Sequence, residues 1–128
     1  MNGKLYVTFA LQDVPGNGHD DVAAPGNGFV DVFDLQGNLL TQLISQGHLD
    51  SPWGMVFAPP TFGPLSGDLL VGNFGDGRIN AYDPTTGAFE STLLGADGRL
   101  LSITDLWALT VGNGTNGGVA TALIAFGS

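Results

Sequence analysis

The sequence contains no cysteine, and only three of its 128 residues are basic. The absence of cysteine excludes disulfide bonds and thiolate metal sites. Lys4, Arg78 and Arg99 are too few to neutralise several phosphates, so nucleic acid is excluded as a partner. The 12 acidic residues give a formal net charge of -9, which predicts that the chain does not bind anionic membranes.

Long hydrophobic runs are also absent. No apolar run reaches the roughly 18 residues that a membrane span requires, and no basic and then apolar leader opens the chain. Short apolar runs alternate instead with 21 glycines and 7 prolines. All but one of the acidic residues are aspartate, whose side chain bonds to nearby backbone in turns. The composition therefore predicts an all-β protein with many short strands and tight turns.

Nine stretches have the length and the residue types of β-strands. Segment 11–28 has no hydrophobic periodicity and is predicted to be a long loop. The predicted strands are 4–10, 29–35, 39–45, 53–58, 68–74, 78–82, 88–94, 105–111 and 119–126.

These stretches repeat an internal pattern. Segment 3–7 resembles 67–71, and segment 28–34 resembles 77–83. Trp53 and Trp107 also occupy the same place in two similar segments. If the strands of one repeat are called A to D, the single domain 1–128 reads BCD, ABCD, AB. Its three units then span about 3–45, 49–94 and 103–126.

We interpret this repeat as two four-stranded antiparallel propeller-type blades plus one extra strand. Closed propellers have about four to eight blades, so this number of strands cannot close a ring alone. Two or three copies are therefore expected to assemble into a ring of four or six blades. The strand near Trp107 would then complete the BCD unit of the next chain. The alternative is a two-sheet sandwich whose blades pack face to face.

The motifs also carry a resemblance. Three motifs in order resemble the NHL class of propeller repeats. They are Pro52-Trp53-Gly54 before an apolar strand, then Gly67-Asp68-Leu69-Leu70-Val71, and then Arg78-Ile79 with a Tyr-Asp strand end. Nearly the whole chain resembles an uncharacterised bacterial family of exported propeller-like proteins, some of which end in a cell-envelope sorting tail. The resemblance implies a piece of a longer extracellular or cell-envelope protein and no established activity. The chain departs from that family by lacking a leader, a sorting tail and most of the blades.

One dense group of metal-ligating residues lies in the long loop. His19, Asp20 and Asp21 could hold Ca²⁺ through their side chains and backbone carbonyls. The spacing lacks the D-x-D-x-D-G pattern of a calcium loop, which favours the alternative of a solvated loop tip. Calcium is the one candidate cofactor.

The remaining candidates favour packing and turns. His48 and Asp50 are predicted turn residues, and Asp76 with Arg78 could face the surface of the ring. Trp53 and Trp107 are predicted to pack between blades, with a ligand pocket as the alternative.

We find no catalytic constellation in the sequence. The chain is therefore predicted to be a non-catalytic binding or scaffold module with a protein or glycan ligand. The alternative is a metal-dependent hydrolase or lyase of the propeller-enzyme kind, assembled only in a complete ring. That alternative requires His, Asp or Glu on the inner strands, and none follows Trp53 or Trp107 there.

Overall fold

The computed structural model describes residues 3–12, 22–60, 62–95, 97–111 and 123–126. In this part of the chain it contains nine β-strands and one short 3₁₀ helix, and each strand overlaps one of the predicted stretches. The elements are β1 (Lys4–Phe9), β2 (Phe29–Asp34), β3 (Leu39–Ser45), β4 (Pro52–Phe57), η1 (Gly63–Leu65), β5 (Leu69–Asn73), β6 (Ile79–Tyr82), β7 (Phe89–Thr92), β8 (Ala108–Val111) and β9 (Leu123–Phe126).

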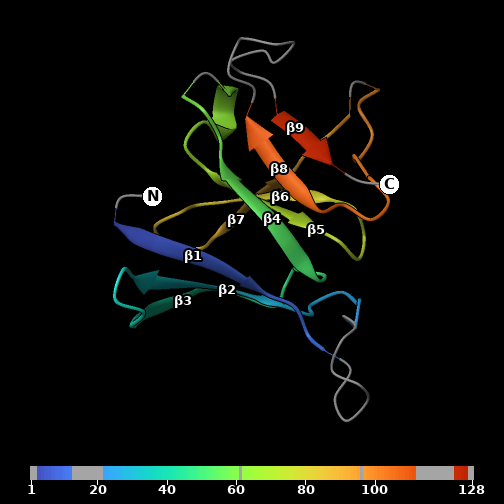
Figure 1. Cartoon of the computed structure of the whole chain (residues 1–128). Coiled ribbons are helices and arrows are strands. Elements are labelled where there is room, and N and C mark those ends of the chain that lie inside the picture. Colours follow the sequence, from blue (N-terminus) through green and yellow to red (C-terminus); the bar gives the residue numbers. More distant parts are fainter. Residues whose placement is uncertain (1–2, 13–21, 61, 96, 112–122, 127–128) are drawn as a thin grey trace.

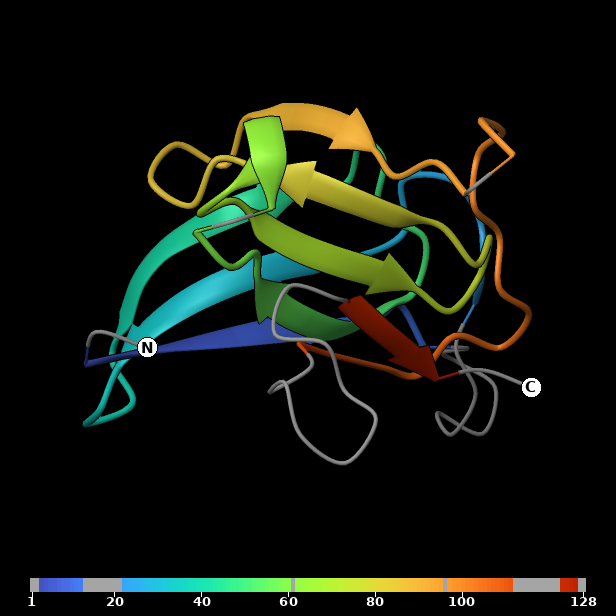
Figure 2. The same cartoon turned by 90° about the horizontal axis from the view of Figure 1, so that it is seen from above.

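The strands form three antiparallel groups in chain order. β1-β2-β3 form the first sheet, β4-β5-β6-β7 form the middle sheet, and β8 pairs with β9. The middle sheet lies between the other two groups (Figure 1). Seen from above, the strands of the first sheet run at an angle to those of the middle sheet (Figure 2). The predicted all-β antiparallel class is confirmed, with sheets of three, four and two strands in the described part of the chain.

The middle sheet is buried on both faces. Every residue of β5 and β6 is buried. Successive side chains of a strand point to opposite faces. Leu69 and Val71 accordingly join the core against the first sheet, whereas Leu70 joins a second core with Leu106 and Leu109. Antiparallel sheets commonly expose one face to water, so burial of both faces identifies this sheet as an interior layer.

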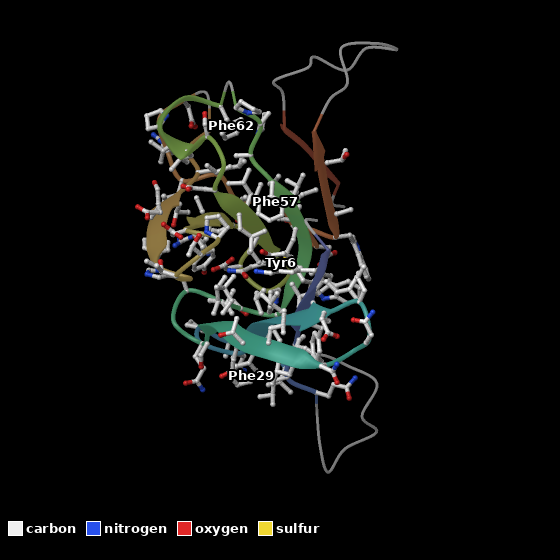
Figure 3. The ribbon with its side chains drawn as sticks, turned by 90° about the vertical axis from the view of Figure 1, so that its left-hand side faces the viewer. Tyr6, Phe29, Phe57 and Phe62 are labelled. Atoms are coloured by element: carbon white, nitrogen blue, oxygen red, sulfur yellow. The ribbon has the colours of Figure 1, made fainter. Side chains whose placement is uncertain are left out.

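The first core fills the space between the first and middle sheets. Val30 and Ile44 of the first sheet pack with Leu69, Val71 and Tyr82. The rings of Tyr6 and Phe57 meet edge to face, with centroids 5.4 Å apart. Figure 3 shows these two side chains close together between the sheets. Each fully buried aliphatic side chain of this kind stabilises the fold by about 1.5–3 kcal/mol.

The other face of the first sheet is open. Leu5, Phe9 and Leu39 are 47%, 42% and 58% exposed. Leu5 pairs across the strands with Phe33, and Phe9 pairs with Phe29. Phe29 lies on the side of the first sheet away from the middle sheet (Figure 3). The first sheet therefore presents a mainly apolar outer face, formed by Leu5, Val7, Phe9, Phe29, Phe33 and Leu39, with Asp31 on the same face opposite Val7.

Aspartate side chains form the turns, as the composition indicates. The Oδ1 atom of Asp34 accepts bonds from the backbone N–H groups of Gln36 and Asn38. Asp76, Asp83 and Asp97 accept similar bonds from residues two positions further on. These bonds stabilise turns in place of strand pairing, and Asp34 and Asp83 stand at the ends of β2 and β6.

Strand β8 begins later than the sequence predicts. Residues 105–107 were expected within the strand, but Asp105 has a φ of 52° and β8 starts at Ala108. A residue with positive φ cannot continue a β-strand, so Trp107 lies in the approach to β8. Of the last predicted strand, residues 123–126 are found in β9, and 119–122 lie outside the described residues.

A turn of the middle sheet touches the first sheet at Gly87. Its φ is 76°, and a Cβ atom there would overlap the carbonyl oxygen of Leu43 in β3. Gly37 has a φ of 88°, but no atom lies within 4 Å of a Cβ placed there. The two glycines therefore share a backbone conformation and differ in what surrounds them.

We expect Gly37→Ala to lower the free energy of unfolding by about 1–2 kcal/mol, because it adds left-handed strain alone. Gly87→Ala should cost a further 1–3 kcal/mol or so, because the contact with Leu43 must also open. Urea denaturation of the two variants measures this difference. Equal losses of stability would show that the Gly87 contact does not hold the sheets together.

Candidate functional site

The predicted calcium ligands His19, Asp20 and Asp21 lie outside the described residues. Within the residues that are described, no group of three or more His, Cys, Asp or Glu side chains could hold a metal ion. No helix in the described part has the length and hydropathy of a membrane span. The candidate site consists of polar and aromatic residues around segment 48–54, which leads into β4 of the middle sheet.

Two buried asparagines bind the backbone of His48. The Nδ2 groups of Asn73 and Asn80 donate to the His48 carbonyl oxygen at 2.9 and 3.1 Å. Asn80 also accepts a bond from the Thr92 hydroxyl at 2.7 Å. The His48 ring stacks on Phe89 with centroids 3.7 Å apart. His48 thus lies in a turn, as predicted, and a hydrogen-bond network holds it in place.

Asp50 lies in a buried part of the loop that leads into β4, between Leu49 and Ser51, which are both 0% exposed. It is only 6% exposed, and its Oδ1 atom has no hydrogen-bond partner among the described residues. A Cβ atom at Gly75 would overlap this carboxylate, so Gly75 leaves the space that Asp50 fills. Burial, and to a lesser extent the charge of Asp76, raises the pKa of Asp50 above its ordinary value. Asp50 is therefore more than the plain turn residue that the sequence predicts.

Three aromatic side chains meet at one end of β4. The ring centroid of Trp107 lies 4.6 Å from that of Trp53 and 5.2 Å from that of Phe74, and both contacts are edge to face. Trp53 and Phe74 are 6.2 Å apart. Trp53 is 42% exposed and Trp107 is 47% exposed. This aromatic cluster, Trp53 with Phe74 and Trp107, thus combines the predicted packing between sheets with a surface open to solvent.

The backbone brings the two tryptophans together. Ser51 and Asp105, each two residues before a tryptophan, have φ values of 50° and 52°. Each turn aims its tryptophan toward the same region. Gly54 allows the approach, because a Cβ atom there would lie 2.8 Å from the Trp107 carbonyl oxygen and from the Leu109 nitrogen. Any larger residue at position 54 would push β4 and β8 apart.

Acidic residues border the aromatic cluster. Asp50, Asp76 and Asp105 each stand within three positions of a cluster member along the chain. The Ser102 hydroxyl donates to the Asp76 carbonyl oxygen, and the Ile103 N–H donates to Gly77. These bonds place the segment before Trp107 against the turn that follows Phe74. Acidic residues therefore flank the aromatic cluster along the chain, and the Asp76 backbone contacts the segment that leads to Trp107.

Two cavities lie near these elements. One of about 170 Å³ is lined mainly by polar groups, including those of His48, Asp76, Arg78 and Asn80. The other, of about 390 Å³, opens between the first and middle sheets beside Lys4, Tyr6 and Phe57. Asp76 and Arg78, which the sequence placed at the surface, thus share the smaller cavity.

Sequence reasoning missed several residues of this region. Asn73 and Asn80 were read as ordinary strand residues, although polar amides inside the apolar stretches 69–73 and 79–82 were an available signal. Phe74 was assigned to a strand end, and no pattern in the sequence pairs it with the tryptophans. Such pairing depends on contacts between residues distant in the chain.

The fold and site together define an all-β protein of stacked antiparallel sheets that carries an exposed aromatic cluster at one end of an interior sheet. No family model matches the chain, and no solved structure matches it. The resemblance to NHL repeats and to a bacterial exported family therefore gains no support from these comparisons.

The curated proteins similar to the chain include three uncharacterised proteins of Acanthamoeba polyphaga mimivirus, so these relatives are viral and not bacterial. One is 40% identical over 99 residues, which cover 77% of the chain and 26% of the relative. The second is 36% identical over 105 residues, or 82% and 26% of the two proteins. The third is 35% identical over 107 residues, or 84% and 20%. The chain thus spans about a quarter or less of the length of these relatives.

The raised pKa of Asp50 predicts a pH dependence of stability. In the unfolded chain this carboxyl titrates near 3.8. The folded protein holds the proton to higher pH, so the free energy of unfolding should fall as pH rises above that value and stay lower at neutral pH. Asp50→Asn resembles the neutral acid and should raise the melting temperature at pH 7.

Thermal denaturation from pH 3 to pH 7 measures this effect. Asp97→Asn, in an exposed turn, is the matched control for the loss of one carboxylate. If Asp50→Asn shows the same pH profile as the unmodified protein, the pH dependence does not come from the raised pKa of Asp50.

Proposed function

We propose that the chain supplies blades of a β-propeller and acts as a non-catalytic binding or scaffold module. Its three strand groups follow the repeat order BCD, ABCD, AB, which supports the interpretation as blades. Strand β4 lies beside β8, and these are the A strands of successive units, while β1, a B strand, contacts β4 from the other side (Figure 1). The Thr8 hydroxyl also donates to the Trp53 carbonyl oxygen at 3.0 Å. Radial repetition places the innermost strands of neighbouring blades in this way.

Equivalent loops of successive units make similar contacts. The N–H of Ser51, before β4, donates to Asn27, which precedes β2. The N–H of Ile103, before β8, donates to Gly77, which precedes β6. In both cases the segment before an A strand bonds to the loop before the C strand of the preceding unit, which supports the propeller interpretation.

The observation that carries the binding function is the aromatic cluster. Exposed tryptophans in mutual contact offer a large and rigid apolar surface, and tryptophan is enriched among the residues that dominate binding energy at interfaces. The enzyme alternative requires several converging metal ligands, and nothing in the described residues favours it. Fold alone does not decide between the two, so the proposal rests on this surface.

Intrinsic fluorescence tests the binding function directly, because Trp53 and Trp107 are the only tryptophans in the chain. Titration with a panel of short peptides of both charges and neutral oligosaccharides should quench or shift the emission for at least one class. By calorimetry, Trp107→Ala should weaken that binding at least about fivefold, because such a residue contributes 1 kcal/mol or more. No response to any member of the panel would overturn the proposal.

We also propose that the apolar outer face of the first sheet is covered by a sheet of a second copy. In the sequence repeat, Leu5 and Val7 correspond to Leu69 and Val71. Leu69 and Val71 belong to the middle sheet and are buried there by the first sheet. The outer face of the first sheet therefore corresponds to the face of the middle sheet that a neighbouring sheet covers. Stacking of copies in this way produces the expected ring of two or three chains.

Analytical ultracentrifugation at micromolar concentration should therefore give two or three times the chain mass of 13.2 kDa. Leu5→Glu should shift the protein toward the monomer, because it buries a charge in the contact. Leu100→Glu is the control, since Leu100 is equally exposed at 47% but lies in a loop away from that face. A monomer without substitution would contradict the ring.

A further inference from the structure

We propose that the aromatic cluster binds positively charged side chains, the guanidinium or ammonium groups of a basic segment in a partner protein. This inference rests on the proposed binding function and names the chemistry of its ligand. It is carried by the exposed rings of Trp53 and Trp107, by the carboxylates at their border and by the charge of the chain.

The rings provide the first part of the site. A cation over the face of an aromatic ring is attracted by the ring quadrupole, and tryptophan is the strongest of the aromatic residues in this interaction. The two tryptophans meet at an interplanar angle of 74°, so their faces point in different directions. Because both rings are about half exposed, a ligand can reach ring faces without any rearrangement of the core.

Carboxylates provide the second part. Asp76 lies two residues after Phe74 and Asp105 lies two residues before Trp107, in segments that hydrogen bonds hold together. Three aspartates, Asp50, Asp76 and Asp105, and one arginine, Arg78, thus stand within four positions of a cluster residue along the chain. Arg78 lies two residues after Asp76, while Lys4 and Arg99 belong to other parts of the chain. Acidic groups beside exposed tryptophans favour a cationic ligand over a neutral one.

The overall charge provides the third part. With a net charge of -9, the chain repels anionic ligands and attracts cationic ones over a distance of about one Debye length. A neutral oligosaccharide could stack on the same rings, but it would gain nothing from the aspartates. An arginine-bearing segment uses both features, since guanidinium stacks on aromatic faces and pairs with carboxylates.

The experiment compares four probes of similar size by tryptophan fluorescence. They are an arginine–glycine peptide, a lysine–glycine peptide, a glutamate–glycine peptide and a neutral cello-oligosaccharide. We expect the arginine peptide to quench the emission most and the lysine peptide to follow, with affinity falling as salt rises. Quenching by the oligosaccharide without quenching by the basic peptides would overturn the cationic ligand and leave the binding module intact. If none of the four probes changes the tryptophan emission, both the cationic ligand and the proposed binding function are overturned.

Substitutions, measured by calorimetry, then distinguish binding of the peptide at the aromatic cluster from attraction of the peptide by the net charge of the chain. Trp107→Ala should weaken binding of the arginine peptide about fivefold or more, and Trp107→Phe should weaken it less, because a smaller ring face remains. Circular dichroism and sedimentation of both variants establish that they are folded.

Asp76→Asn should weaken binding about two- to threefold while keeping the turn, because the amide oxygen can still accept the bond from the Arg78 N–H. Asp83→Asn is the matched control. Asp83 forms the same kind of turn at the other end of β6 and carries the same charge. Equal losses from Asp76→Asn and Asp83→Asn would show that net charge alone attracts the peptide, which would overturn the site.

Discussion

The structure depends on the burial of the middle sheet on both faces. Strands β5 and β6 are too short to be stable alone, and their apolar side chains point alternately toward two separate cores. Each core needs residues from a neighbouring strand group, Val30 and Ile44 on one side and Leu106 and Leu109 on the other. The order of the three groups in space follows from this requirement.

This constraint also explains where the polar residues lie. Asn73 and Asn80 occupy buried positions of the middle sheet, and the Nδ2 groups of their amides require an acceptor there. The His48 carbonyl meets that need, so the loop that leads into β4 is fixed against the sheet. Fixing this loop also fixes the direction in which Trp53 leaves it. The core and the aromatic cluster are thus connected through a short chain of hydrogen bonds.

Much of the fold follows from local patterns in the sequence. Turn aspartates and alternating apolar residues locate all nine strands because those signals act between near neighbours, as at Asp34 and Asp83. The late start of β8 escaped prediction because the positive φ of Asp105 has no signature in its residue type alone. The burial of Asp50 and the place of Phe74 also escaped it. Both depend on contacts with residues far away in the chain, and hydrophobic periodicity carries no information about such contacts.

The matching turns at Ser51 and Asp105 have a geometric consequence. The φ angles of 50° and 52° turn the chain in the same sense before β4 and β8, which lie side by side. If the proposed repeat continues in further copies, the same turn would recur before each A strand, and its backbone conformation would contribute to the angle between neighbouring sheets and so to the curvature of the assembly.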